Sequence, residues 1–243
     1  MMKKFFLLTL CMMLAVSLNK NDKIQAMPSK RLADFSNPKR TYLTYLYAVK
    51  QNDLELAKQC WIFSEENTDS ILDVLVGTWV THHYFNEIVV SKFHEKGKQF
   101  IRGDCTDTAI DRTIERVEDS STTISGNRAE LMIAWQKGDG FPVEVFHYTP
   151  DEPIIFRKVN DKWKIDANEM TGLKDGSSEA IFFDPCGIGA LMRSEKNILE
   201  ELIQELKEDR ITTPEALEKA WKHKVNELMK MKQSLDCIEK PHL

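Results

Sequence analysis

The sequence predicts an α+β fold in which three N-terminal helices pack on an antiparallel sheet and a C-terminal helical hairpin follows. Helical periodicity runs through residues 37–96, apolar and polar residues then alternate as far as residue 166, and helical periodicity returns from about residue 190. With 42% hydrophobic and 29% charged residues among 243, the chain can form a core. This composition lies outside the disordered and polytopic membrane classes.

The first 26 residues have the pattern of a secretory signal peptide. Two lysines precede an apolar run, Phe5–Leu18, which is too short to span a bilayer, and polar residues follow at once. The region Ser17–Ala26 contains small residues of the kind that precede a signal-peptide cleavage site, and the exact position of cleavage stays open. We therefore expect an exported protein, periplasmic or extracellular, that is not inserted in a membrane after processing.

The processed chain is expected to be acidic and to retain four cysteines. Cleavage after Ala26 removes four of the 33 basic residues and one of the 38 acidic residues, so 29 basic and 37 acidic residues remain. A net negative protein repels phosphate backbones, and we therefore expect no nucleic-acid partner. The pairing of the cysteines stays open between disulfides and free thiols. They are Cys60, Cys105, Cys186 and Cys237.

The first two helices are predicted from their start signals. Asn37 is followed by Pro38, the usual order of an N-cap and a first helical residue, and a buried stripe follows at helical spacing. Its members are Tyr42, Tyr45, Leu46 and Val49. Asp53 is expected to cap a second, short helix that ends near Trp61. The two helices should therefore meet at a tight corner.

The third predicted helix spans about Ser70–Lys96 and is apolar over more than half of its circumference, so it should be mostly buried. After a loop at residues 103–105, alternation predicts strands from Thr113 onward, through Ala129–Trp135 and near residues 142–148. Asn160-Asp161 separates two further alternating runs and predicts a hairpin turn. Residues 171–189 are rich in turn formers and predict a loop, and residues 190–234 form the C-terminal helical hairpin.

The chain resembles the nuclear transport factor two and ketosteroid isomerase superfamily, also called the SnoaL-like cone, over residues 37–170. Two segments carry the resemblance: P-K-R-T-Y-L-T-Y-L-Y-A-V-K-Q-N-D-L-E-L-A-K-Q-C-W at the start and F-R-K-V-N-D-K-W-K-I-D at the end of the sheet. They are similar to secreted bacterial members of unassigned function. The resemblance implies that the sheet is curved into a cone, but it carries no chemistry because these positions are core and turn positions.

Family enzymes place a general-base Asp and an oxyanion-stabilising Tyr or acid inside the cone, sometimes with a His–Asp pair. The resemblance therefore directs attention to His147, the histidine on a predicted strand. Alternation places this residue beside two valines, where a packed histidine is the favoured interpretation. Asp166 alternates away from Trp163 and Ile165 and is expected outside, so we expect no His–Asp pair and no catalytic residue. If the cone is not filled, aromatic and histidine side chains would line an apolar pocket. The candidates are Tyr45, Trp79, His82, His147 and Trp163.

A second candidate constellation lies on the third helix. His83 and Glu87 are one turn apart and His94 follows two turns later on the same face. A histidine and a carboxylate at this spacing can ligate a metal, but a zinc site needs three or four ligands held close together. The favoured interpretation is a solvated polar face, and we expect neither a metal site nor a cofactor.

The sequence favours an exported cone domain that binds a small apolar molecule or a protein partner without catalysis. Two alternatives remain: a small lyase or isomerase that acts inside the cone, and an assembly module that uses the C-terminal helices. A homodimer through the sheet is compatible with each of them.

Overall fold

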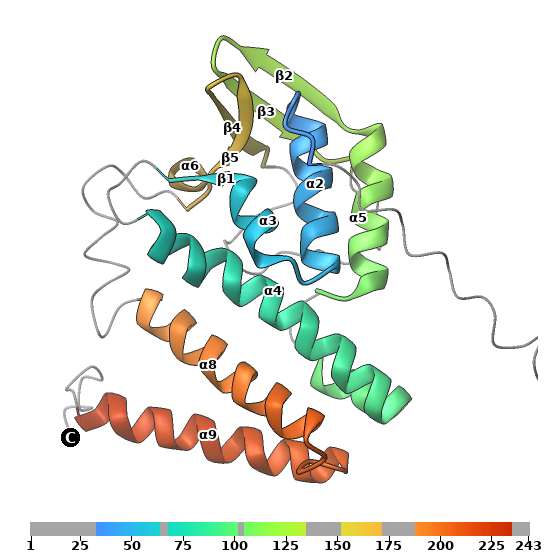
Figure 1. The fold of residues 1–243 in the computed structure, drawn as a ribbon, viewed down its shortest axis with the longest axis vertical. Coiled ribbons are helices and arrows are strands. Elements are labelled where there is room, and N and C mark those ends of the chain that lie inside the picture. The colour runs from blue at the N-terminus through green and yellow to red at the C-terminus, as the bar shows by residue number, and fades with distance from the viewer. Residues whose placement is uncertain (1–32, 64–67, 102–104, 135–151, 172–187, 235–243) are drawn as a thin grey trace, which may run out of the picture. The chain divides into compact units, whose positions relative to one another are not determined.

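The computed structural model describes residues 33–63, 68–101, 105–134, 152–171 and 188–234. They form the predicted α+β fold with C-terminal helices, and all the elements below belong to the compact unit Asp34–Leu243 (Figure 1). The signal peptide, the strand expected near residues 142–148, His147, Cys186, Cys237 and most of the expected loop at 171–189 lie outside the described residues.

The first two helices begin where their cap residues predict. In α2 (Pro38–Lys50), the Asn37 side chain accepts a hydrogen bond from the backbone N–H of Arg40 at 3.0 Å. In α3 (Leu54–Gln59), Asp53 accepts from the N–H of Leu56 at the same distance. The corner between them passes through Asn52 in the left-handed region, with φ 55°. Asparagine tolerates this conformation better than most residues do, and the corner is therefore tight without a glycine.

The third predicted helix is present, but a further helix follows where a strand was expected. The third predicted helix is α4 (Thr68–Phe93), followed by the 3₁₀ helix η1 (His94–Phe100). Residues that alternation assigned to a strand instead form α5 (Asp107–Asp119), so that prediction is wrong. Thr106 starts this helix by accepting from the N–H of Ala109 at 3.2 Å. Its buried residues Ile110, Thr113 and Val117 follow helical spacing. The alternation that predicted a strand covers too few residues to distinguish a strand from a helix.

The sheet has five strands among the described residues, in the order β1-β5-β4-β3-β2. Three neighbouring pairs are antiparallel, but β1 and β5 are parallel, so the expectation of a wholly antiparallel sheet is wrong. The sheet is not closed or curled, and the expected cone is corrected to an open mixed sheet. Its strands are β1 (Trp61–Ile62), β2 (Ser121–Ser125), β3 (Arg128–Met132), β4 (Ile154–Val159) and β5 (Lys162–Asp166).

The β4–β5 hairpin has the predicted turn. Asn160 and Asp161 both have positive φ, 49° and 61°, as a two-residue turn between right-twisted strands requires. The register opposes Phe156 to Ile165, and both are fully buried against the helices. Trp163 lies on the same face as Ile165, as alternation predicted, and is 5% exposed.

Asp166 is buried, contrary to the expectation that it lies outside. It is on the face opposite Ile165, but only 2% of its surface is exposed. A short helix, α6 (Ala167–Thr171), which the sequence did not predict, follows the strand directly. Oδ1 of Asp166 accepts from the backbone N–H groups of Asn168 and Glu169, at 3.1 and 3.3 Å, and so caps this helix.

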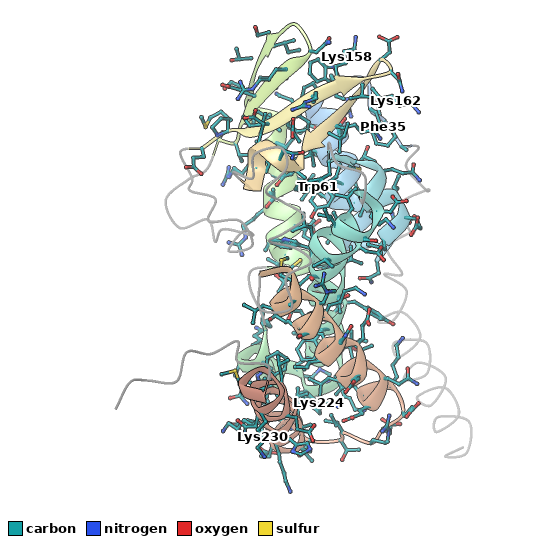
Figure 2. The ribbon with its side chains drawn as sticks, turned by 90° about the vertical axis from the view of Figure 1, so that its left-hand side faces the viewer. Phe35, Trp61, Lys158, Lys162, Lys224 and Lys230 are labelled. Atoms are coloured by element: carbon teal, nitrogen blue, oxygen red, sulfur yellow. The ribbon has the colours of Figure 1, made fainter. Side chains whose placement is uncertain are left out.

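The C-terminal residues form the predicted helical hairpin of α8 (Ile188–Lys207) and α9 (Pro214–Ser234). Thr213 caps α9 by accepting from the N–H of Ala216 at 3.1 Å. In Figure 1, α8 lies alongside α4 and α9 lies alongside α8, and both contacts are extensive. Lys224, labelled in Figure 2, joins α9 to Glu201 of α8 at 2.6 Å.

Two apolar clusters form the core, and α4 contributes to both. Ile71 and Trp79 belong to the cluster between the helices and the sheet. Phe85, Val89 and Phe93 belong to a second cluster with α8 and α9. The hairpin is therefore docked through the C-terminal half of α4. Among the described residues, no helix combines the length and the apolar character needed to cross a membrane.

Candidate metal centre

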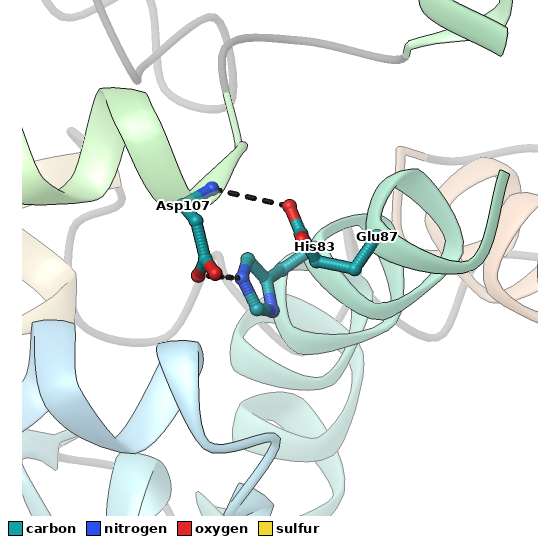
Figure 3. Close-up of side chains that lie close together, drawn as sticks. All are labelled: His83, Glu87 and Asp107. Carbon is teal, nitrogen blue, oxygen red and sulfur yellow. Dashed lines mark hydrogen bonds and ion pairs between the residues drawn. The ribbon is translucent and has the colours of Figure 1, made fainter. Parts of the chain in front are cut away.

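A histidine and two carboxylates converge where α4 meets the start of α5. His83 and Glu87 lie one turn apart on α4, and Asp107 is the first residue of α5 (Figure 3). One potential ligand atom from each residue lies within 4.8 Å of the others. The group combines one imidazole and two carboxylates from two separate helices, a composition that suits a divalent metal ion.

Hydrogen bonds fix the relative positions of the three side chains. The ring nitrogen Nε2 of His83 lies 3.1 Å from Oδ1 of Asp107. The backbone N–H of Asp107 donates to Oε1 of Glu87 at 3.2 Å, and this contact joins the two helices directly (Figure 3). The Asn86 side chain donates to the carbonyl oxygen of Cys105 at 3.1 Å, which anchors the chain just before α5.

The site is buried on one side and open on the other. The His83 side chain is 1% exposed, whereas the Asp107 side chain is 46% exposed. The hydrogen bond with His83 lowers the pKa of Asp107; partial burial opposes this shift, and the charge of Lys50 adds to it. Asp107 is therefore a carboxylate at neutral pH, the form that ligates a metal.

Cys105 is close in sequence to Asp107 but does not join the cluster. Its Sγ donates to the carbonyl oxygen of Trp79 at 3.6 Å. Burial raises the pKa of this thiol well above its usual value, and the negative charges of Glu87 and Asp107 raise it further. A thiolate is the form that binds metals, so Cys105 is not suited to serve as a ligand here.

The distances fit a small rearrangement on metal binding. Ligand atoms about 2.1 Å from a tetrahedral ion are about 3.4 Å from one another. Nε2 of His83 and Oδ1 of Asp107, 3.1 Å apart, are slightly closer than that, and no separation in the group has to shrink by more than about 1.4 Å on the same geometry. Glu87 can supply this movement by side-chain rotation because it has the longest flexible stem of the three. Three protein ligands would leave a fourth position for water.

The other histidines of the described residues lie in different settings. Nε2 of His82 lies 3.4 Å from Oε1 of Glu195, between α4 and α8 of the hairpin. Nε2 of His223 lies 3.3 Å from Oε1 of Glu227 on the exposed face of α9, where both side chains are at least 60% exposed. His94, the first residue of η1, has φ 53° and is exposed, and it is not part of the cluster around His83. The sequence favoured a solvated polar face for His83, Glu87 and His94, and this is wrong for His83, which is buried.

The predicted pocket residues are distributed over two places. Tyr45, Trp79 and Trp163 belong to the cluster between helices and sheet, and each is less than 10% exposed. The Tyr45 ring lies edge-on to Trp61 with 5.4 Å between centroids, and burial raises the pKa of its hydroxyl. His82 lies apart from them, against α8, and His147 is outside the described residues.

Two residues of the metal centre escaped sequence reasoning. The i, i+4 spacing of His83 and Glu87 is visible in the sequence, but Asp107 was assigned to no site. Asn52, whose Oδ1 lies 3.1 Å from Nδ1 of His83, was assigned to no site either. The available signal was the Thr106-Asp107 start of α5, which would have placed a carboxylate at a helix N-terminus.

Comparison of the chain with protein-family models, with curated proteins and with solved structures finds no match.

Proposed function

We propose that this chain is an exported binding protein whose ligand is a divalent transition-metal ion of the zinc class. The observation that carries the proposal is the convergence of a buried imidazole and two carboxylates from two helices. A nitrogen ligand disfavours calcium and magnesium, which prefer all-oxygen sites, and favours zinc and its neighbours.

The apolar pocket expected from the sequence has less support than the metal centre. Tyr45, Trp79 and Trp163 take core positions, so the metal centre is better supported than an apolar pocket lined by them. The apolar ligand, the lyase or isomerase activity and the assembly role therefore stay as predictions from the sequence. Membership of the cone superfamily also stays a proposal. It is supported by the α2–α3 corner and the β4–β5 hairpin at the positions where the resemblance expects them.

Calorimetric titration of zinc tests the proposed function. Tag-free protein spanning residues 27–243, freed of metal by chelation, should bind one ion per chain. Glu87→Gln and Asp107→Asn keep the side-chain shape but remove a charged ligand. Each should weaken binding by about tenfold or more, because the described residues supply three ligands and each loss leaves two. Bound metal should also raise the melting temperature, since a ligand of the native state stabilises it.

Two controls separate this site from adventitious surface binding. Asp111→Asn removes an exposed carboxylate on the same helix α5, where Asp111 pairs with Lys50 at 2.6 Å. His223→Ala removes the exposed histidine of α9. Both variants should bind zinc like the unsubstituted protein. If zinc binding is absent, or is lost with His223 and kept in the Asp107 variant, the cluster is a structural ion pair between α4 and α5.

A further inference from the structure

Asn52 contacts the candidate metal centre from a third element. It lies in the corner between α2 and α3, and its Oδ1 is 3.1 Å from Nδ1 of His83 on α4. The other ring nitrogen, Nε2, faces Asp107 at the same distance. The buried imidazole is thus held between an amide oxygen on one side and the carboxylates on the other.

The chemistry of the amide oxygen determines which tautomer of His83 it supports. A carbonyl oxygen only accepts hydrogen bonds, so Nδ1 must carry the hydrogen in this contact. When a metal ion takes the lone pair of Nε2, the nitrogen that faces Asp107, the hydrogen of the neutral imidazole stays on Nδ1, where Asn52 accepts it. Metal-ligating histidines commonly donate their second N–H to an oxygen in this way, and the contact fixes both the tautomer and the ring orientation.

We propose that Asn52 is a positioning residue of the metal centre: it holds Nδ1–H of His83 and presents Nε2 to the metal ion. The inference rests on the proposed function, because it concerns how the same site prepares its nitrogen ligand. Asn52 does not itself contact the ion. It acts through His83, and its contribution is to hold the ring orientation and the Nδ1 hydrogen that the metal-bound histidine needs.

The backbone at Asn52 allows a clean substitution series. Its φ of 55° lies in the left-handed region, which glycine, asparagine and aspartate adopt more easily than other residues. Asn52→Gly keeps the corner and removes the acceptor, whereas Asn52→Asp keeps the corner and supplies a stronger acceptor. Asn160 has φ 49° in the β4–β5 turn and provides a matched control, Asn160→Gly, at a site remote in sequence.

The experiment measures zinc affinity by competition with a chromophoric chelator in the unsubstituted protein and the three variants. Asn52→Gly should weaken zinc binding by about 10–100-fold, the usual range for losing such an outer contact. Asn52→Asp and Asn160→Gly should bind at least as tightly as the unsubstituted protein. Melting temperatures measured with chelator present establish that each variant is folded.

The ¹⁵N chemical shifts of the His83 ring provide a readout that a merely structural role would not change. In the zinc-bound unsubstituted protein, the ring of His83 should carry its proton on Nδ1. In Asn52→Gly the ring should lose this preference, although the variant is as stable as the unsubstituted protein. The inference is overturned if Asn52→Gly leaves both affinity and ring shifts unchanged, or if Asn52→Asp loses affinity as Asn52→Gly does. Absence of zinc binding in the unsubstituted protein would instead overturn the proposed function, and this inference with it.

Discussion

The Nε atom of Arg157 lies 2.8 Å from Oδ2 of Asp166, and this ion pair joins β4 to the buried end of β5. The register places Arg157 directly between Arg128 and Lys164 on the outer face of the sheet. Like charges opposite one another destabilise a sheet, so this row of three cations needs compensation. Asp166 supplies it to Arg157, and Glu130 pairs with Arg128.

Asp166→Ala should therefore destabilise the protein by about 2–3 kcal/mol, the range of a hydrogen bond to a charged group together with a helix cap. The substitution removes the partner of Arg157 and the cap of α6 together. Chemical denaturation measures the change in the free energy of unfolding. The exposed ion pair of Lys158 with Asp161 provides the control, because Asp161→Asn tolerates the turn conformation and should cost less than about 0.5 kcal/mol. Equal losses would show that Asp166 contributes only a surface charge.

Trp163→Ala should cost about 3–5 kcal/mol, as for other buried aromatic residues. The ring is buried in the main core, and its backbone carbonyl accepts from the Thr41 hydroxyl at 3.0 Å. Lys162→Ala should cost far less, because Lys162 is exposed and only approaches the Phe35 ring at 5.8 Å (Figure 2). Lys164 is a poorer control than alternation suggested, since its ammonium group lies 4.1 Å from the same ring centroid and is half-buried. A similar loss at Trp163 and Lys162 in thermal denaturation would contradict the register.

The docked hairpin can be tested with two leucines of α8. Leu202 is fully buried against α4, whereas Leu191 is 48% exposed. Leu202→Ala should cost about 2–5 kcal/mol and Leu191→Ala much less, because only the first creates a cavity. Deletion of residues 190–243 should expose Phe85, Val89 and Phe93 and cause aggregation or a lower melting temperature, read by light scattering and calorimetry. A truncated protein that stays monomeric and equally stable would show that α4 does not need the hairpin.

Cys60 should resist alkylation in the folded protein. Burial raises the pKa of this thiol to about 12, because the ionised form loses its hydration there. An unfolded thiol ionises near pH 9.0, so the protein should lose stability as the pH rises from about 9 towards 12. Iodoacetamide at pH 8 followed by peptide mass spectrometry should modify Cys60 only after unfolding. Rapid modification of the native protein would contradict the burial of this thiol.

The elements with short-range signals were predicted well. Each of these signals acts within four residues, and the structure has the expected caps and turn. The signals are Asn37 with Pro38, Asp53, and Asn160 with Asp161. The prediction failed at α5 because alternation over the few residues from Thr113 was taken as a strand, whereas the buried residues 110, 113 and 117 follow helical spacing. The parallel pairing of β1 with β5 and the closure of the sheet depend on long-range contacts that no local pattern encodes.

The metal centre was only half predictable for the same reason. His83 and Glu87 are neighbours on one helix, but Asn52 and Asp107 reach His83 from 31 and 24 residues away. The sequence also favoured a solvated face for His83. In the structure His83 is buried, and the corner of α2 and α3 and the start of α5 cover it. Three separate backbone segments had to be placed before the cluster could be recognised.

The division of α4 between two apolar clusters has a consequence for biosynthesis. A ribosome delivers the chain from its N-terminus, and Phe85, Val89 and Phe93 have no α8 to pack against until residues 198–206 have been made. For more than a hundred residues of elongation, the second half of this helix presents an apolar stripe to its surroundings. Nascent chains at this stage should be the species on which chaperones act, while the part of α4 before His83 can already pack with α2 and α3.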